Sequence, residues 1–149
     1  MRKKQIFIAA IVGLITFLVY LPALQNGFVN LWDDNKYVTK NPHIQSLDLK
    51  LLKWAFFEFY HSNWHPLTNI SYAIDYAIWG LNPFGYHLVN NIFHSLNTFL
   101  VVLLSAQILT VTGRLSDKSI LIASAITGLL FGIHPIHVES VAWVSERKD

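Results

Sequence analysis

Long apolar runs separated by polar stretches organise this chain. The first run, QIFIAAIVGLITFLVYLPAL, covers residues 5–24 and contains no charged side chain. An α-helix of about 20 residues, at about 1.5 Å per residue, crosses the ~30 Å hydrocarbon layer of a membrane. The run therefore predicts a membrane-spanning helix over residues 5–24.

The flanks of this run indicate its orientation. Arg2, Lys3 and Lys4 precede it, and basic flanks stay on the cytoplasmic side, so we expect a cytoplasmic N-terminus. A secretory signal peptide also begins with basic residues, but its apolar part is shorter. The LPALQNG stretch that follows here offers no convincing small-residue cleavage site. The pattern favours an uncleaved span, with residues 25–85 in an extracytoplasmic loop.

Two helices are expected inside that loop. SLDLKLLKWAFFEFY predicts a helix with Ser46 as its N-cap, and its mixture of charged, aliphatic and aromatic residues suits a helix in the headgroup region. HPLTNISYAIDYAIWG predicts a helix that begins at Pro66 and stops at Gly80. Its apolar residues fall on one face at helical spacing: Leu67, Ile70, Ile74 and Ile78.

Two further apolar runs predict spans over about 86–109 and 119–133. The connector between them carries Arg114 and Lys118, as expected of a cytoplasmic turn. The later run has small residues at four-residue spacing, which allow close contact between helices: Ser124, Gly128 and Gly132. Residues 134–149 return to the outer side. The expected fold is an all-α, multi-pass membrane bundle of three spans, with juxtamembrane helices in the first outer loop.

The first half of the run over 86–109 is polar on one side. His87, Asn90, His94 and Asn97 recur at a spacing that forms a single stripe along a helix. Polar groups at membrane depth face protein or a wet cavity. The stripe predicts either a water-accessible cavity or hydrogen bonds that join helices, and the spacing does not decide between them.

Composition supports a membrane protein. Hydrophobic residues make up 53% of the chain and charged residues 13%, against ~25% charged residues in a typical soluble domain. The net charge of +2, without a basic patch, gives no indication of nucleic-acid binding. There are no cysteines, which excludes disulfides, thiolate metal sites and cysteine nucleophiles.

Two stretches of the first outer loop carry candidate chemistry. Asp33 and Asp34 are adjacent in LWDDNKYV; one Asp could simply cap a turn, or one carboxylate could act as a general base with its neighbour tuning the pKa or holding a cation. His65 precedes the helix start at Pro66. That start could be purely structural, or it could direct His65 and free backbone N–H groups at an anion such as phosphate.

The C-terminal stretch HPIHVESVAWVSERKD adds more candidates. His134, His137 and Glu139 resemble a metal site only weakly, because Glu139 does not share the helical face of the histidines. We predict no metal there and no firm cofactor, although a divalent cation could take part. Arg147 and Lys148 are either solvated loop charges or a clamp on a lipid-linked phosphate.

Taken together, LWDDNKYVTKNPHI, NWHPLTNISYAIDYAIWGLNPFGYHLVNNIFH and FGIHPIHVESVAWVSERKD resemble the N-terminal membrane part of the transmembrane and tetratricopeptide-repeat family. The resemblance covers nearly all of the chain from about residue 28. It implies a partial C-type glycosyltransferase fold and a membrane O-mannosyltransferase. In that family a polyprenyl- or dolichyl-phosphate sugar is the donor, and a Ser/Thr hydroxyl of a protein is the acceptor.

The resemblance also implies residue roles. An acidic pair in the first outer loop carries the catalytic base, which corresponds to Asp33 and Asp34 here. Related O-mannosyltransferases have a His-Pro-Pro-Leu stretch, and the His65–Pro66–Leu67 sequence lacks one of its prolines, so that equivalence is looser. The predicted residues for binding substrate and lipid phosphate are His65, His94, Glu139, Arg147 and Lys148.

Length is the main departure from the family, whose members carry more spans and tetratricopeptide repeats. Residues 1–149 contain three expected spans and no repeat of about 34 residues, so we expect a fragment that is inactive alone. The alternative is a non-catalytic scaffold or assembly module. A transporter is less favoured, because the spans carry no charged residue in their interiors. The expected partners are the lipid-linked donor, a protein acceptor and membrane lipids, in a bacterial inner membrane or, alternatively, the endoplasmic reticulum.

Overall fold

A computed structural model describes residues 2–148, and these are predominantly helical. The six α-helices among them are α1 (Arg2–Val19), α2 (Leu49–Phe57), α3 (Pro66–Trp79), α4 (Pro83–Val111), α5 (Asp117–Ile133) and α6 (Val138–Ala142). Short 3-10 or π turns are η1 (Leu21–Gln25), η2 (Asn35–Thr39), η3 (Pro42–Gln45), η4 (Pro135–His137) and η5 (Val144–Lys148). No β-strand occurs within residues 2–148, so the all-α prediction is confirmed.

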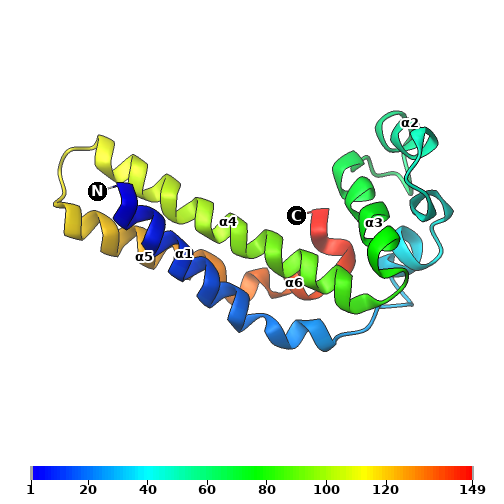
Figure 1. Cartoon of the computed structure of the whole chain (residues 1–149), viewed down its shortest axis with the longest axis horizontal. Helices are drawn as coiled ribbons and strands as arrows, with labels where there is room; N and C mark the ends of the chain where they lie inside the picture. Colours follow the sequence, from blue (N-terminus) through cyan, green and yellow to red (C-terminus); the bar gives the residue numbers. More distant parts are fainter. Residues whose placement is uncertain (1, 149) are drawn as a thin grey trace. The chain divides into compact units, whose positions relative to one another are not determined.

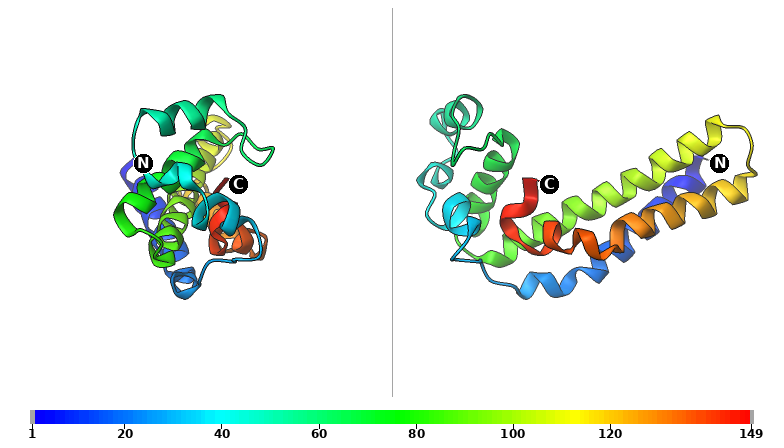
Figure 2. Two further views of the ribbon diagram at one scale, coloured as in Figure 1. Left: turned by 90° about the vertical axis from the view of Figure 1, so that its right-hand side faces the viewer. Right: turned by 180° about the vertical axis from the view of Figure 1, so that it is seen from behind.

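The chain divides into two compact units. The first unit comprises Met1–Pro22 and Asn91–Val138, and the second comprises Ala23–Asn90 and Glu139–Asp149. In the first unit α1, α5 and most of α4 run side by side (Figures 1 and 2). In the second unit α2, α3, the start of α4 and the C-terminal segment surround their own core.

Small residues allow the three helices of the first unit to approach closely. Ser124, Gly128 and Gly132 of α5 are all buried. A Cβ atom added at Gly128 would collide with the side chain of Val102 on α4, and one added at Gly132 would collide with the Thr16 hydroxyl on α1. The close helix contact expected from their four-residue spacing is therefore confirmed.

Among the described residues, only one of the three expected spans is by itself a helix long and apolar enough to cross a membrane. It is α4, Pro83–Val111, with 29 residues. The third expected span, α5, meets the same test only if it is counted together with the segment Pro135–Ala142, from which it is bent by 44°. In α1, the charged Arg2, Lys3 and Lys4 occupy the first turn of an 18-residue helix.

The expected helix over residues 5–24 ends earlier than its hydropathy suggests. α1 stops at Val19 and the chain continues as the 3-10 turn η1, Leu21–Gln25. Pro22 explains the change, because proline lacks an N–H donor and disfavours the α conformation of the preceding residue. The helix lengths therefore do not establish a bundle of three spans. The structure establishes only that the fold is all-α.

In the second unit, α2 begins later than expected. Its N-cap is Asp48, whose carboxylate accepts a hydrogen bond from the Leu51 amide at 2.9 Å. Ser46, the expected cap, instead donates from its hydroxyl to Asp48 at 3.4 Å. The expectation of Ser46 was wrong because two capping residues compete within three positions, and the later one is adjacent to the first helical turn.

α3 begins at Pro66 and ends at Trp79, with Gly80 at φ 60° as its cap, which confirms both expected boundaries. Most of the apolar stripe, however, does not face the core: Leu67 is 75% exposed and Ile78 is 66% exposed, whereas Ile70 packs against the core. The buried side of α3 carries Asn69, Tyr72, Ala73 and Asp75. A polar face packs inward because the second unit supplies a partner for its buried charge.

Candidate active site

The two adjacent carboxylates in the second unit have different surroundings. Asp34 is completely buried. One of its oxygens accepts a hydrogen bond from the Val29 amide at 2.8 Å. The other accepts from the Ser145 amide at 2.9 Å and also from the Ser145 hydroxyl. Asp34 thus fastens the loop that precedes η2 to the C-terminal segment, and its carboxylate has no oxygen left without a donor.

Asp33 is the accessible member of the pair. Its side chain is 32% exposed, and it forms an ion pair with Lys36, at 3.2 Å between Oδ1 and Nζ. Lys36 is itself 53% exposed, so the contact is a surface pair of the kind that contributes little to stability. A carboxylate in this position can accept a hydrogen bond, and then a proton, from a hydroxyl that approaches from solvent.

Arg147 is at the centre of a buried polar cluster. It pairs with Asp75 at 2.6 Å, and both side chains are 3% exposed. Its other N–H groups donate to Asn90 Oδ1 at 2.6 Å, to Ser71 Oγ at 3.0 Å and to the Tyr86 carbonyl at 2.9 Å. Arg147 is therefore neither a solvated loop charge nor a cation that is open to solvent.

Burial in the same cluster shifts the pKa values of Tyr72 and Asp75. The Arg147 guanidinium carbon lies 4.7 Å from the centre of the Tyr72 ring, in a cation–π arrangement. Burial raises the pKa of Tyr72 above its ordinary value. Burial also raises the pKa of the Asp75 carboxyl, while the adjacent Arg147 guanidinium opposes that rise. Asp75 was not among the candidates from the sequence, although it is the single charged residue of α3.

A small pocket lies beside this cluster, at the start of α3. It is lined by Tyr37, His65, Thr68, Asn69, Tyr72, Ser145 and Lys148. His65 occupies the N-cap position, and its side chain makes no capping hydrogen bond. Lys148 is paired with Glu146 at 3.0 Å. The pocket has a volume of about 10 Å³, room for about one water molecule, and the imidazole, ammonium group and helix N-terminus beside it are groups that attract an anion.

The two remaining candidates are not brought into this pocket. His94 belongs to the first unit, where its Nε2 lies 2.9 Å from the Gly132 carbonyl oxygen and its ring packs against Tyr20. Glu139 belongs to the second unit and is exposed in the first turn of α6. The pocket thus contains two of the predicted binding residues, His65 and Lys148.

The polar stripe of α4 is mainly used for hydrogen bonds between segments. Asn90 donates to the Trp143 carbonyl at 3.1 Å and accepts from Arg147, and His94 contacts the Gly132 carbonyl on α5. His87 is buried, whereas Asn97 is exposed. For Asn90 and His94, these contacts favour a role in hydrogen bonds that join helices over a role in lining a cavity. Within residues 2–148 no group of three or more His, Asp or Glu side chains is placed to hold a metal.

The sequence is similar to protein O-mannosyl-transferases. It is 33% identical over 143 residues, 91% of this chain, to protein O-mannosyl-transferase Tmtc1 of Drosophila melanogaster. It is 33% identical over 150 residues, 95% of this chain, to TMTC3 of Homo sapiens, and 38% identical over 89 residues, 60% of this chain, to TMTC2 of Homo sapiens.

The chain spans 15% of the length of Tmtc1, 15% of TMTC3 and 10% of human TMTC2. No family model matches the sequence. No solved structure matches it either.

Proposed function

We propose, from the premise that this chain belongs to the Tmtc protein O-mannosyl-transferase family, that it forms part of a membrane glycosyltransferase. The sugar is mannose, as in the names of its relatives, and the acceptor is a Ser or Thr hydroxyl of a protein. The donor is a polyprenyl- or dolichyl-phosphate sugar. Residues 1–149 alone are not expected to be active, because they correspond to 15% of Tmtc1.

The unequal acidic pair is the observation that carries this proposal. Asp34 is buried and accepts hydrogen bonds from Val29 and Ser145, so its role is to position the loop. Asp33 is the accessible carboxylate, and we assign the general base to it. Asp33 takes the proton of the acceptor hydroxyl while that oxygen bonds to the sugar's anomeric carbon. The bond from this carbon to the lipid phosphate breaks, and the phosphate leaves with the electron pair.

The pocket at the start of α3 supports a site for the leaving phosphate. Negative charge develops on the phosphate as the glycosidic bond breaks, and cations or helix N-termini stabilise it. His65 and Lys148 supply the side chains, and α3 supplies the backbone N–H groups of its first turn. Arg147 acts here as a positioning residue, since Asp75 and its other partners already engage its guanidinium.

The membrane arrangement is a further part of the proposal. The first-unit helices α1, α4 and α5 cross the membrane as three spans, and residues 134–149 return to the outer side. The N-terminus and the α4–α5 connector are cytoplasmic. Support comes from α4, which is long and apolar enough to cross, and from the basic residues at both cytoplasmic positions: Arg2, Lys3, Lys4, Arg114 and Lys118.

The assignment of the base is tested in the intact protein that contains this chain. Asp33→Asn should lower transfer of radiolabelled mannose from dolichyl-phosphate mannose to a Ser/Thr peptide by about 10²–10⁴-fold, because the general base is lost. Helix content should be unchanged, since the ion pair of Asp33 with Lys36 is exposed. Asp48→Asn is the matched control, an acid of the same unit that caps α2, and it should transfer at the normal rate.

Asp34→Asn separates positioning from proton transfer. The amide group would place an N–H donor against either the Val29 amide or the Ser145 amide, both of which are donors. We expect reduced thermal stability together with reduced transfer. Normal transfer by a well-folded Asp33→Asn protein would overturn the assignment.

A further inference from the structure

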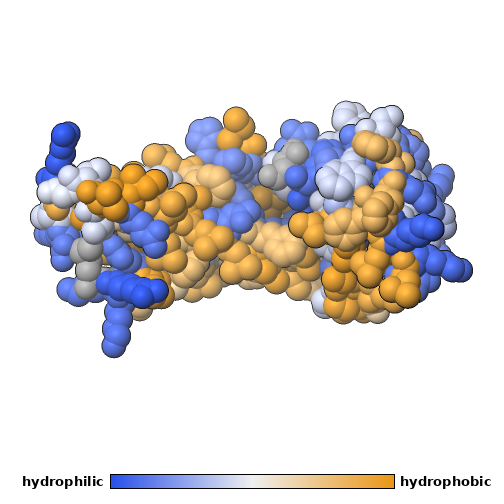
Figure 3. All heavy atoms as spheres, turned by 90° about the horizontal axis from the view of Figure 1, so that it is seen from above, coloured by the Kyte–Doolittle hydropathy of each residue, from blue (hydrophilic) through white to orange (hydrophobic). Residues whose placement is uncertain are grey.

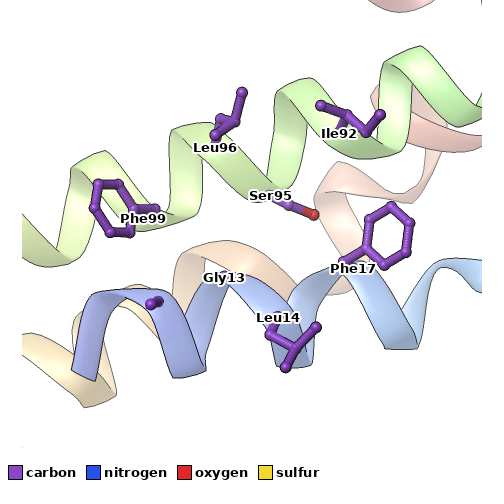
Figure 4. Close-up of a pocket in the computed structure, with 8 residues that line it drawn as sticks. Gly13, Leu14, Phe17, Ile92, Ser95, Leu96 and Phe99 are labelled. Atoms are coloured by element: carbon purple, nitrogen blue, oxygen red, sulfur yellow. The ribbon is translucent and has the colours of Figure 1, made fainter. Parts of the chain in front are cut away.

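An apolar groove runs between α1 and α4 in the first unit (Figure 4). Its volume is about 290 Å³. Four residues of each helix line it: Ala10, Gly13, Leu14 and Phe17 of α1, and Ile92, Ser95, Leu96 and Phe99 of α4. Gly13 lets the two helices approach closely at the groove, because a Cβ added there would lie 3.1 Å from the Ser95 carbonyl oxygen and 3.5 Å from Phe99 Cβ.

The groove offers almost no polar group to an occupant. Ser95 is its one polar residue, and the Ser95 hydroxyl already donates to the Asn91 carbonyl at 2.8 Å. Leu14 is 58% exposed and Leu96 is 53% exposed, so apolar side chains form its rims. A partner helix, a cylinder about 10 Å wide, does not fit between two helices that are already in contact. A single hydrocarbon chain does.

A second groove of the same unit shows the contrast. It lies on the α4 face that carries Asn97 and Gln107 and is completed by Phe131 of α5. Both amide residues are exposed there, and exposed amides are the groups with which a transmembrane helix pairs. The groove at Gly13 lacks them, so it suits a lipid chain.

Basic residues gather at one end of the first unit. Figures 1 and 2 show the start of α1 at the same end as the α4–α5 connector, and Figure 3 shows hydrophilic surface there, next to a largely hydrophobic stretch. Arg2, Lys3, Lys4, Arg114 and Lys118 are exposed at this end, against one acidic residue, Asp117. Such a cluster attracts anionic lipid headgroups.

The spacing along α1 connects the charges to the groove. Ala10 lies about 9 Å and Gly13 about 14 Å along the helix from Lys4, at about 1.5 Å per residue. One leaflet of the hydrocarbon layer is about 15 Å deep, half of the full ~30 Å. A phospholipid whose phosphate sits at Lys3 and Lys4 therefore extends its acyl chain along the groove.

We propose that the first unit carries a binding site for an anionic phospholipid of the cytoplasmic leaflet, with the headgroup at Lys3 and Lys4 and one acyl chain in the groove beside Gly13. The site rests on the membrane placement proposed above and is independent of sugar transfer. It is also distinct from the donor, whose phosphate is expected on the opposite side of the membrane.

Native mass spectrometry of the whole chain tests the site. The protein is released from detergent micelles that contain equimolar dioleoylphosphatidylglycerol and dioleoylphosphatidylcholine. Ala10→Phe fills the groove and should reduce the lipid-bound fraction at least fivefold, and Ile92→Trp should do the same from α4. Thr127→Phe, on the exposed face of α5, is the matched small-to-large control and should retain lipid as the unmodified chain does.

Headgroup selectivity is tested separately. Lys3→Gln combined with Lys4→Gln should reduce the preference for phosphatidylglycerol by about fivefold for each lysine, the factor that corresponds to ~1 kcal/mol per basic residue near an anionic surface. Lys50→Gln with Lys53→Gln, in the second unit, should leave the preference unchanged. Three results would overturn the proposal. The Ala10→Phe and Thr127→Phe proteins could retain lipid equally, or the unmodified chain could retain the two lipids equally. The unmodified chain could also form a lipid-free dimer that Ala10→Phe dissociates.

Discussion

Replacing Arg147 by methionine tests whether this residue is a structural centre or a cation that serves a ligand. Methionine keeps much of the volume and removes the charge. The change leaves the Asp75 carboxylate, 3% exposed, without its partner at 2.6 Å. It also removes the donors that reach Asn90 and Ser71. Removing one member of a buried ion pair costs about 3–5 kcal/mol, a large share of the ~5–15 kcal/mol that stabilises a typical protein.

The loss should depend on pH in a defined direction. Burial already raises the pKa of Asp75, and Arg147 opposes that rise, so removing Arg147 raises this pKa further. A carboxyl whose folded-state pKa is raised contributes most to stability below its unfolded pKa, about 3.9, and loses that contribution as pH rises through the folded pKa. Arg147→Met should therefore be most destabilised at neutral pH and should recover towards pH ~4.

Thermal unfolding in detergent micelles, followed by circular dichroism, measures the effect. For a chain of this size about 3–5 kcal/mol corresponds to a decrease in Tm of roughly 6–20 °C, at roughly 2–4 °C per kcal/mol. The double variant Asp75→Leu with Arg147→Met should be more stable than Arg147→Met alone, because no buried charge remains. A change below about 1 kcal/mol for Arg147→Met, with no pH dependence, would refute the structural role and favour a ligand-binding one.

Two further changes test packing in each unit. Gly128→Leu should destabilise the first unit by about 1–3 kcal/mol or more through overpacking against Val102, whereas Thr127→Leu, one position along and exposed, should stay within about 0.5 kcal/mol; thermal unfolding distinguishes them. Tyr72→Phe removes the hydroxyl that donates to the Val144 carbonyl at 2.9 Å but keeps the ring beside Arg147, and it should cost about 1 kcal/mol in the same assay.

The helices could be predicted from the sequence where local signals set their ends. Pro66 and Gly80 fix the ends of α3 by their own backbone preferences, and no distant contact is needed to see this. The end of α1 was missed because hydropathy was followed through Pro22, although the same backbone argument applied there. The inward face of α3 could not be predicted, since the apolar stripe at Leu67 and Ile78 gives the opposite orientation.

The sequence predicted only part of the candidate site, because the contacts that complete it are made between residues far apart in the chain. Adjacent carboxylates at Asp33 and Asp34 mark a place of interest, but no local pattern shows which of them is buried. Asp34 is distinguished by Ser145, 111 positions away, and the partner of Arg147 is Asp75 on α3. The sequence gives no sign that Ser145 is a buried hydrogen-bond donor, because the residue type is the same for an exposed serine and a buried one.

These long-range contacts explain how the pocket is held in shape. Ser145 is fixed by Asp34, and Arg147 is fixed by Asp75 and Asn90, so the residues on either side of Glu146 are both anchored to buried partners. Lys148 follows directly and lines the pocket with His65. Because two separate anchors hold the segment that carries Lys148, loss of either should displace the pocket wall. Loss of the Asp75 anchor should do so without disturbing the loop of the accessible Asp33. Variants at Asp34 or Asp75 should then weaken donor binding, whereas Asp33→Asn should leave donor binding intact and remove only the transfer step.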